Sequence, residues 1–107
     1  MNNQKKFDPD FQNEAGQGYL HRYAALGDLT AIKVITEAGA NVNLPDNSGM
    51  TPMHYAAYNG HLPAVRALFN AGANPNHRAI DGQNVADSAR NGEHEFIARY
   101  IERYMMR

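Results

Sequence analysis

Apolar residues recur at intervals of three and four in three separate segments of the chain, which is the spacing of one face of an α-helix. Gly39 and Gly72 follow the first two segments. The pattern predicts three amphipathic helices, the first two closed by a glycine. Their apolar positions are Leu29, Ile32 and Ile35, then Leu62, Val65 and Leu68, then Ile97, Tyr100 and Ile101.

A shorter helix is predicted before each amphipathic one. In the segment "MTPMHYAAYNG", Thr51 suits the N-cap and Pro52 the first helical position, where its missing N–H would have no intrahelical partner. Gly60, which Gly27 matches one unit earlier, ends this helix because a left-handed residue is tolerated there. Paired alanines at positions 24–25 and 56–57 are small enough to let neighbouring helices approach closely.

This pair of helices repeats with a period of 33 residues. "NEAGQGYLHRYAALGDLTAIKVITEAGANVN" at 13–43 aligns with "DNSGMTPMHYAAYNGHLPAVRALFNAGANPN" at 46–76, and the matched histidines give 54 minus 21, or 33. In a third, less regular copy Gly92 falls 32 residues after Gly60, which predicts that one residue is lost there. One unit is too short to bury its own apolar face, so the copies are expected to stack. The predicted divisions are a leader at 1–12, repeats at 13–45 and 46–78, and a degenerate capping repeat at 79–107.

A 33-residue period that contains "TPMHYA" resembles the ankyrin repeat, whose signature is a turn, the sequence T-P-L-H-x-A and two antiparallel helices. The second repeat follows this pattern closely, whereas the first has "GYLH" and the third has "NVAD" at the helix start. The resemblance implies an all-α solenoid of stacked helix-turn-helix units with β-turn tips. It also implies a protein-binding surface on the concave face, formed by the turn tips and the exposed side of the inner helices. The corresponding positions are Gln17, Leu26, Asn47, Ser48, Met50, Tyr58, Asn59, Ile80, Asp81, Gln83, Arg90 and Asn91.

Four of these positions carry apolar side chains that the repeat does not need for its core: Leu26, Met50, Tyr58 and Ile80. Scattered exposed apolar residues are common on protein surfaces, so surface variation is one interpretation. A binding patch is the other, because aromatic and methionine side chains are favoured at interfaces. Tyr58 is the strongest single candidate.

His21 and His54 admit two readings, a metal site or a structural role. Each stands at the start of a predicted inner helix, where a hydrogen bond to backbone is expected of a buried imidazole. Stacked helices lie about 10 Å apart, too far for the two rings to share a metal with bonds of about 2 Å. His61 matches the turn histidine of the family, and His77 and His94 stand alone. We therefore predict structural histidines, no metal site and no cofactor.

Composition removes several other classes of function. The 107 residues amount to one domain, include no cysteine, and carry a formal net charge of −1, which gives no general attraction for nucleic acid. No signal sequence or apolar stretch of about 18 residues is visible, so a cytoplasmic location is expected, with secretion by a route without a signal left open. Ser48 and Ser88 are not in a nucleophile motif, and "GQG" is too short for a phosphate loop. No enzyme activity is predicted.

The two ends of the chain carry apolar residues of their own. The C-terminal segment is expected to form a capping helix with Phe96, Ile97, Tyr100, Ile101 and Tyr104 along one stripe, and Tyr104, Met105 and Met106 either wrap the end or form a second contact surface. In the leader, Asp8 and Pro9 suggest a helix start, and Phe7 and Phe11 are expected to lie near one another over the first repeat.

These observations favour a protein that binds one protein partner and inhibits, masks or sequesters it, as an immunity, antitoxin-like or regulatory protein would. A metal- or ligand-binding accessory protein that uses the histidines, and a structural or assembly adaptor, are the alternatives. The chain is expected to be monomeric, with possible self-association through its C-terminal helix.

Overall fold

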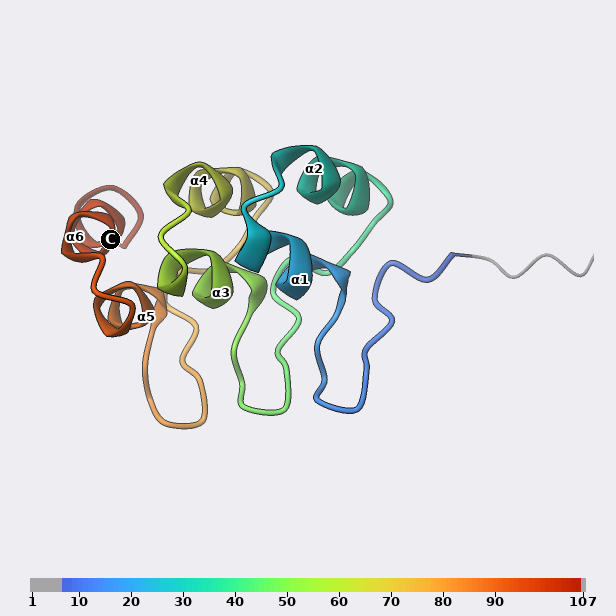
Figure 1. Cartoon of the computed structure of the whole chain (residues 1–107), viewed down its shortest axis with the longest axis horizontal. Helices are drawn as coiled ribbons and strands as arrows, with labels where there is room; N and C mark the ends of the chain where they lie inside the picture. The colour runs from blue at the N-terminus through green and yellow to red at the C-terminus, as the bar shows by residue number, and fades with distance from the viewer. Residues whose placement is uncertain (1–6, 107) are drawn as a thin grey trace, which may run out of the picture.

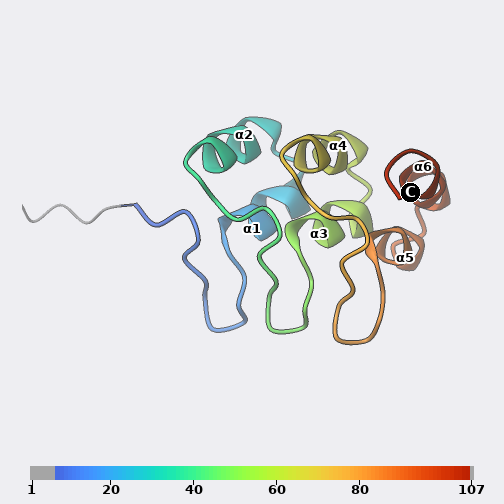
Figure 2. The same ribbon diagram turned by 180° about the vertical axis from the view of Figure 1, so that it is seen from behind.

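The computed structural model describes residues 7–106, which form six α-helices in three antiparallel pairs (Figure 1). The inner row contains α1 (Tyr19–Leu26), α3 (Pro52–Tyr58) and α5 (Val85–Asn91), and the outer row contains α2 (Leu29–Glu37), α4 (Leu62–Asn70) and α6 (Glu95–Tyr104). The loops between pairs hang as hairpins below the inner row, as both side views show (Figures 1 and 2). No strand occurs within residues 7–106. The predicted all-α solenoid is confirmed.

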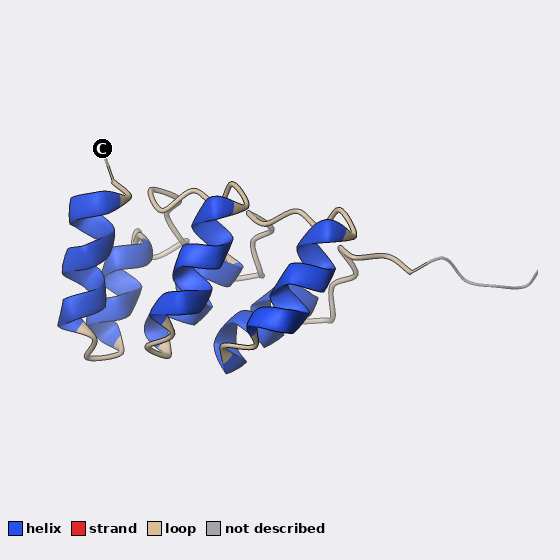
Figure 3. Ribbon diagram, turned by 90° about the horizontal axis from the view of Figure 1, so that it is seen from above, coloured by secondary structure: helices blue, strands red, loops and turns tan. Residues whose placement is uncertain are grey.

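The helices stack because each pair buries one apolar layer against the next. Figure 3 shows the three outer helices side by side, with the inner helices behind them. Most of the predicted outer-helix positions face this core, including Ile32, Val65, Leu68 and Ile101, each at most 1% exposed. Leu29 was wrongly assigned to the core: it is 46% exposed and lines a groove between α2 and α4.

The helix starts repeat at intervals of 33 in all three copies, so the predicted loss of a residue in the third copy is wrong. α1, α3 and α5 begin at residues 19, 52 and 85, and α2, α4 and α6 begin at 29, 62 and 95. Glu93 adopts φ 66° and takes the left-handed place of Gly27 (φ 70°) and Gly60 (φ 79°). The neighbouring Gly92 is required for another reason, because a Cβ there would lie 2.0 Å from the Tyr58 carbonyl oxygen.

Residues 8–12 form no helix, contrary to the start predicted at Asp8 and Pro9. The Asp8 carboxylate instead accepts a hydrogen bond from Asp10 N at 2.9 Å. One period later, the Asn41 side chain accepts the equivalent bond from Asn43 N. The Asp10 carboxylate also accepts a hydrogen bond from Asn41 N at 2.7 Å. The Asn43 side chain accepts the equivalent bond from Asn74 N one period later. The leader therefore reproduces the loop that ends each repeat.

The two leader phenylalanines flank the first inner helix. The rings of Phe7 and Phe11 lie 5.3 and 6.4 Å from that of Tyr19, centroid to centroid, and both phenylalanines remain more than half exposed. Residues 1–6 of the predicted leader lie outside the described residues.

The α6 helix buries a narrower stripe than the sequence suggested. Ile97, Ala98 and Ile101 are buried, whereas Phe96 is 74% and Tyr104 is 52% exposed. The reason is register: residues 97, 98 and 101 match the buried Ala64, Val65 and Leu68 of α4, whereas Phe96 matches the exposed Pro63. Of the residues after the stripe, Met105 is 9% exposed and covers the core.

Candidate functional site

His54 joins the start of its own helix to the next repeat. Thr51 is the N-cap and Pro52 the first residue of α3, as predicted, and Thr51 donates to His54 Nδ1 from its backbone N at 3.2 Å and from its hydroxyl at 2.8 Å. On the other side of the ring, Nε2 lies 3.2 Å from the Gln83 carbonyl oxygen. Since Nδ1 accepts, the proton must be on Nε2, which donates to that carbonyl.

His21 makes the same bridge one period earlier. Gly18 N donates to its Nδ1 at 2.9 Å, and its Nε2 lies 2.9 Å from the Met50 carbonyl oxygen. Burial lowers the pKa of both imidazoles below 6.5, although the carbonyls of Met50 and Gln83 oppose this shift. Both nitrogens of each ring are used in structural hydrogen bonds, so neither ring offers a lone pair to a metal.

The other three histidines lie apart from these bridges. The rings of His61 and His94 pack on the glycine of the preceding repeat: a Cβ on Gly27 would lie 2.7 Å from His61, and one on Gly60 would lie 2.5 Å from His94. His77 stands beside His54, with ring centroids 6.1 Å apart. Within residues 7–106 no three His, Asp or Glu side chains converge on a point that could hold a metal.

The concave face holds a central hollow between the second and third inner helices. It has a volume of about 120 Å³ and is lined by Met50, His54, Tyr55, Tyr58, Asn59 and Ser88. Tyr58 is 53% exposed, so its ring stands at the rim of the hollow, and Met50 is half-buried beside it. The two apolar residues singled out from the sequence therefore line one hollow.

The same face continues on both sides of this hollow. Toward the N-terminus, Gln17, Arg22 and Leu26 line a space of about 480 Å³ together with Phe11 and Tyr19. Toward the C-terminus, a polar space of about 460 Å³ is lined by Asp81, Gln83, Arg90 and Asn91. At the hairpin tips, Asn47, Ser48 and Ile80 are exposed, and Ile80 N donates to the Ser48 carbonyl at 2.9 Å, which ties neighbouring tips together.

One hydrogen-bond network on this face was missed from the sequence. Gln17 Nε2 donates to the Tyr55 hydroxyl at 3.0 Å, and that hydroxyl donates to the Asp46 carboxylate. Burial raises the pKa of Tyr55, and the bond to Asp46 adds to the shift. No sequence motif predicts this network, because it depends on the distance between two repeats and not on the spacing of residues within one repeat. Gln17 thus helps to hold the first two repeats together.

Arg90 lines the C-terminal space together with Asp81 and Asn91, but its match in the second repeat is not the one predicted. With the period unbroken, Asn91 matches Tyr58, whereas Arg90 matches Ala57, which is fully buried against the next repeat. The Arg90 guanidinium instead reaches back to α6, where Nη1 lies 2.7 Å from Glu102 Oε2 and Nε lies 3.0 Å from Glu95 Oε1. Its charge is therefore already paired within the chain.

Comparison with known proteins is consistent with this geometry. A family model described as ankyrin repeats (3 copies) matches residues 2–79. The match ends in the loop before the third helix pair, which begins at Val85 and continues the period of the first two. No curated protein sequence matches the chain. In the described part of the chain, no helix is long and apolar enough to cross a membrane.

Proposed function

Since the chain belongs to the ankyrin-repeat family, whose repeats are generally protein–protein interaction modules, we propose that it binds one protein partner through its concave face. The observation that carries this proposal is the central hollow, where Met50 and the exposed Tyr58 lie together. Interfaces draw most of their binding energy from a few central side chains, and tyrosine is enriched among these. The hollow of about 120 Å³ would accept one side chain of the partner.

The polar residues around the hollow would set the orientation of the partner. Asn59 lies at its edge, Asn47, Ser48 and Ile80 stand on the adjacent tips, and Asp81 and Asn91 line the C-terminal side. The hydrogen bonds from Gln83 lower the pKa of Asp81, which keeps this carboxylate ionised and able to meet a basic residue. Arg90 lines the same side, with its charge already paired by Glu95 and Glu102.

The consequence of binding is proposed to be inhibition, masking or sequestration of the partner in the cytoplasm. Ankyrin repeats are typically not enzymes, and the concave face offers a contact surface rather than a reactive group. An assembly adaptor would use the same surface. A metal-binding role for the histidines is less well supported, because hydrogen bonds occupy both nitrogens of His21 and His54.

The test is a binding measurement with a partner recovered by affinity purification. Tyr58→Ala should weaken binding by about 2 kcal/mol or more, the level that marks an interface hot spot, with little change in melting temperature. Arg66 is the matched control, because it is exposed on the outer helix α4, and Arg66→Ala should leave both properties nearly unchanged.

The contrary result is equally specific. If binding survives Tyr58→Ala combined with Met50→Ala but is lost when Tyr104 and Met105 are changed, the functional surface lies at the C-terminal end. The concave-face proposal would then be discarded.

A further inference from the structure

A groove, which we call the outer groove, lies between the outer helices α2 and α4, on the side of the stack away from the concave face. Its volume is about 450 Å³. Figure 3 shows these two helices side by side, with the inner row behind them. Ile32, which is buried, and Ala67, which is partly buried, form the floor of the groove. Leu29 and Pro63 line it at the starts of the two helices, and both are exposed. The outer groove therefore has an apolar surface open to solvent.

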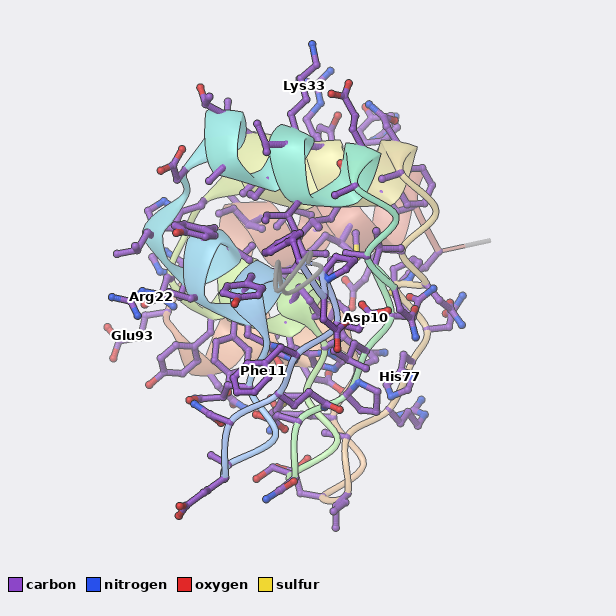
Figure 4. All side chains as sticks on the ribbon, turned by 90° about the vertical axis from the view of Figure 1, so that its right-hand side faces the viewer. Asp10, Phe11, Arg22, Lys33, His77 and Glu93 are labelled. Atoms are coloured by element: carbon purple, nitrogen blue, oxygen red, sulfur yellow. The ribbon has the colours of Figure 1, made fainter. Side chains whose placement is uncertain are left out.

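Each wall of the outer groove carries a cation. Lys33 on α2 and Arg66 on α4 are one period apart, so they occupy the same place in successive repeats and line the groove from opposite walls. Both side chains are exposed, and Figure 4 shows Lys33 pointing away from the stack. The salt bridges within residues 7–106 all involve Arg90 or Arg99, so neither of the two groove cations is paired there.

The lining of the outer groove includes no carboxylate from the described residues. Its other polar side chains are those of Thr36 and Asn70, which are uncharged and lie toward the ends of α2 and α4. The nearest acids along α2 are Asp28, which accepts a hydrogen bond as the N-cap, and Glu37, the last residue of the helix, and neither lines the groove. The positive charge of the two walls is therefore not neutralised within the groove.

We propose that the outer groove binds an acidic amphipathic helix of a protein partner. α2 and α4 have nine residues each, or about 14 Å at 1.5 Å per residue, so the groove matches a partner helix of about two to three turns. The apolar face of that helix packs on Leu29 and Ala67, and acidic side chains on its two flanks meet Lys33 and Arg66. This binding does not rest on the concave-face function, because the hollow beside Tyr58 lies on the inner helices.

Charge complementarity decides between this occupant and other candidates. Unpaired cations on both walls favour carboxylates and repel a basic segment. A nucleic acid or an anionic membrane is held by many cations, whereas the outer groove has two and the chain carries a formal net charge of −1. Only an occupant with both apolar and acidic side chains uses the floor and the walls together.

The test is the binding of a dye-labelled synthetic peptide to the full-length chain, measured by fluorescence anisotropy. The peptide is a helix of about 14 residues with leucine along one face and glutamate on both flanks. It should bind saturably, and a matched peptide with lysine in place of glutamate should not bind. Lys33→Glu and Arg66→Glu should each raise the dissociation constant at least about 10-fold, because each places a like charge against the peptide. Both side chains are exposed, so the variants should keep the wild-type melting temperature.

Arg22 provides the control for net charge. It is exposed on the inner helix α1, so Arg22→Glu changes the charge of the chain by the same amount but should leave peptide binding unchanged. Tyr58→Ala should also leave it unchanged, which separates the outer groove from the concave hollow. Leu29→Gln should weaken binding, because it removes an exposed apolar side chain from the groove.

The absence of saturable binding up to about 1 mM peptide overturns the proposal. So does a loss of binding in Arg22→Glu as large as that in Lys33→Glu, which would indicate a general attraction between charges. Loss of binding in Tyr58→Ala would place the peptide on the concave face. Equal binding of the lysine peptide, or tighter binding of a single-stranded oligonucleotide or of phosphatidylserine vesicles, would assign the outer groove to a different occupant and also overturn the proposal.

Discussion

The second and third repeats share one register. They differ at two positions where a side chain of the second repeat contacts the third. His54 bridges to the Gln83 carbonyl, whereas its counterpart in the third repeat, Asp87, exchanges hydrogen bonds with Asn84 at the start of its own helix. Ala57 packs under α5, and its counterpart is Arg90, which turns back to α6. By contrast, contacts directed to the preceding repeat persist, since His94 packs on Gly60 as His61 packs on Gly27.

This difference separates two kinds of residue within the ankyrin signature. Some residues build the repeat itself, such as the N-caps Gly18, Thr51 and Asn84, which differ in type but begin their helices at the same place in each copy. Others join one repeat to the next, such as His54, whose counterpart in the third repeat is Asp87. Asp28 in the first repeat and Asp87 in the last both accept a backbone N–H at the start of their own helices. At both positions a helix cap within the repeat takes the place of a contact with another repeat.

The largest expected effect comes from removing the bridge on one side of this comparison. His54→Ala leaves the Thr51 N–H and the Gln83 carbonyl without their partner in a buried junction, which should lower the free energy of unfolding by about 1 to 3 kcal/mol. Asp87→Ala removes only a helix cap and should cost about 1 kcal/mol. Urea denaturation of the two variants measures the difference. An equal or smaller loss for His54→Ala would contradict the bridging role.

A second prediction concerns how the free energy of unfolding depends on pH through His21 and His54. The pKa values of His21 and His54 are lowered in the folded chain by burial, so the unfolded chain binds more protons below pH 6.5. The stability due to the neutral rings is therefore fully present above pH 6.5 and is lost as the pH falls below that value. His77 next to His54 strengthens the shift, whereas Asp46 and Asp81 oppose it.

The measurement is the free energy of unfolding from urea titrations between pH 5 and pH 7.5. It should decline steadily below pH 6.5 in the wild type and more shallowly in His54→Ala, which has lost one of the two groups. Asp87→Ala is the control, because it removes no histidine, and it should keep the wild-type slope. A wild-type stability that is flat over this range would show that the rings are not held neutral.

Much of this organisation could be predicted from the sequence, because residues that form contacts within one repeat recur at the same spacing in the next. The period, the caps at Thr51 and Pro52, and the pairing of Met50 with Tyr58 on one face follow from matching one copy with the next. The predictions failed where contacts depend on a neighbour. Counting from Gly60 to Gly92 missed the left-handed Glu93, and so matched Arg90 with Tyr58 in place of Ala57. The bond from Gln17 to Tyr55 likewise depends on the distance between two repeats.

The smallest expected effect tests the remaining difference between the two repeats, at the turn that joins their helices. Glu93 holds φ 66°, a conformation that strains a residue with a Cβ, whereas the second repeat has Gly60 there. Glu93→Gly should relieve this strain and raise the free energy of unfolding by about 0.5 to 1 kcal/mol, after allowing for the greater freedom of glycine in the unfolded chain. Glu93→Ala keeps the Cβ and should bring no comparable gain. Equal stabilities of the glycine and alanine variants would mean that the turn relaxes without glycine, and that the third repeat has lost nothing by departing from the pattern.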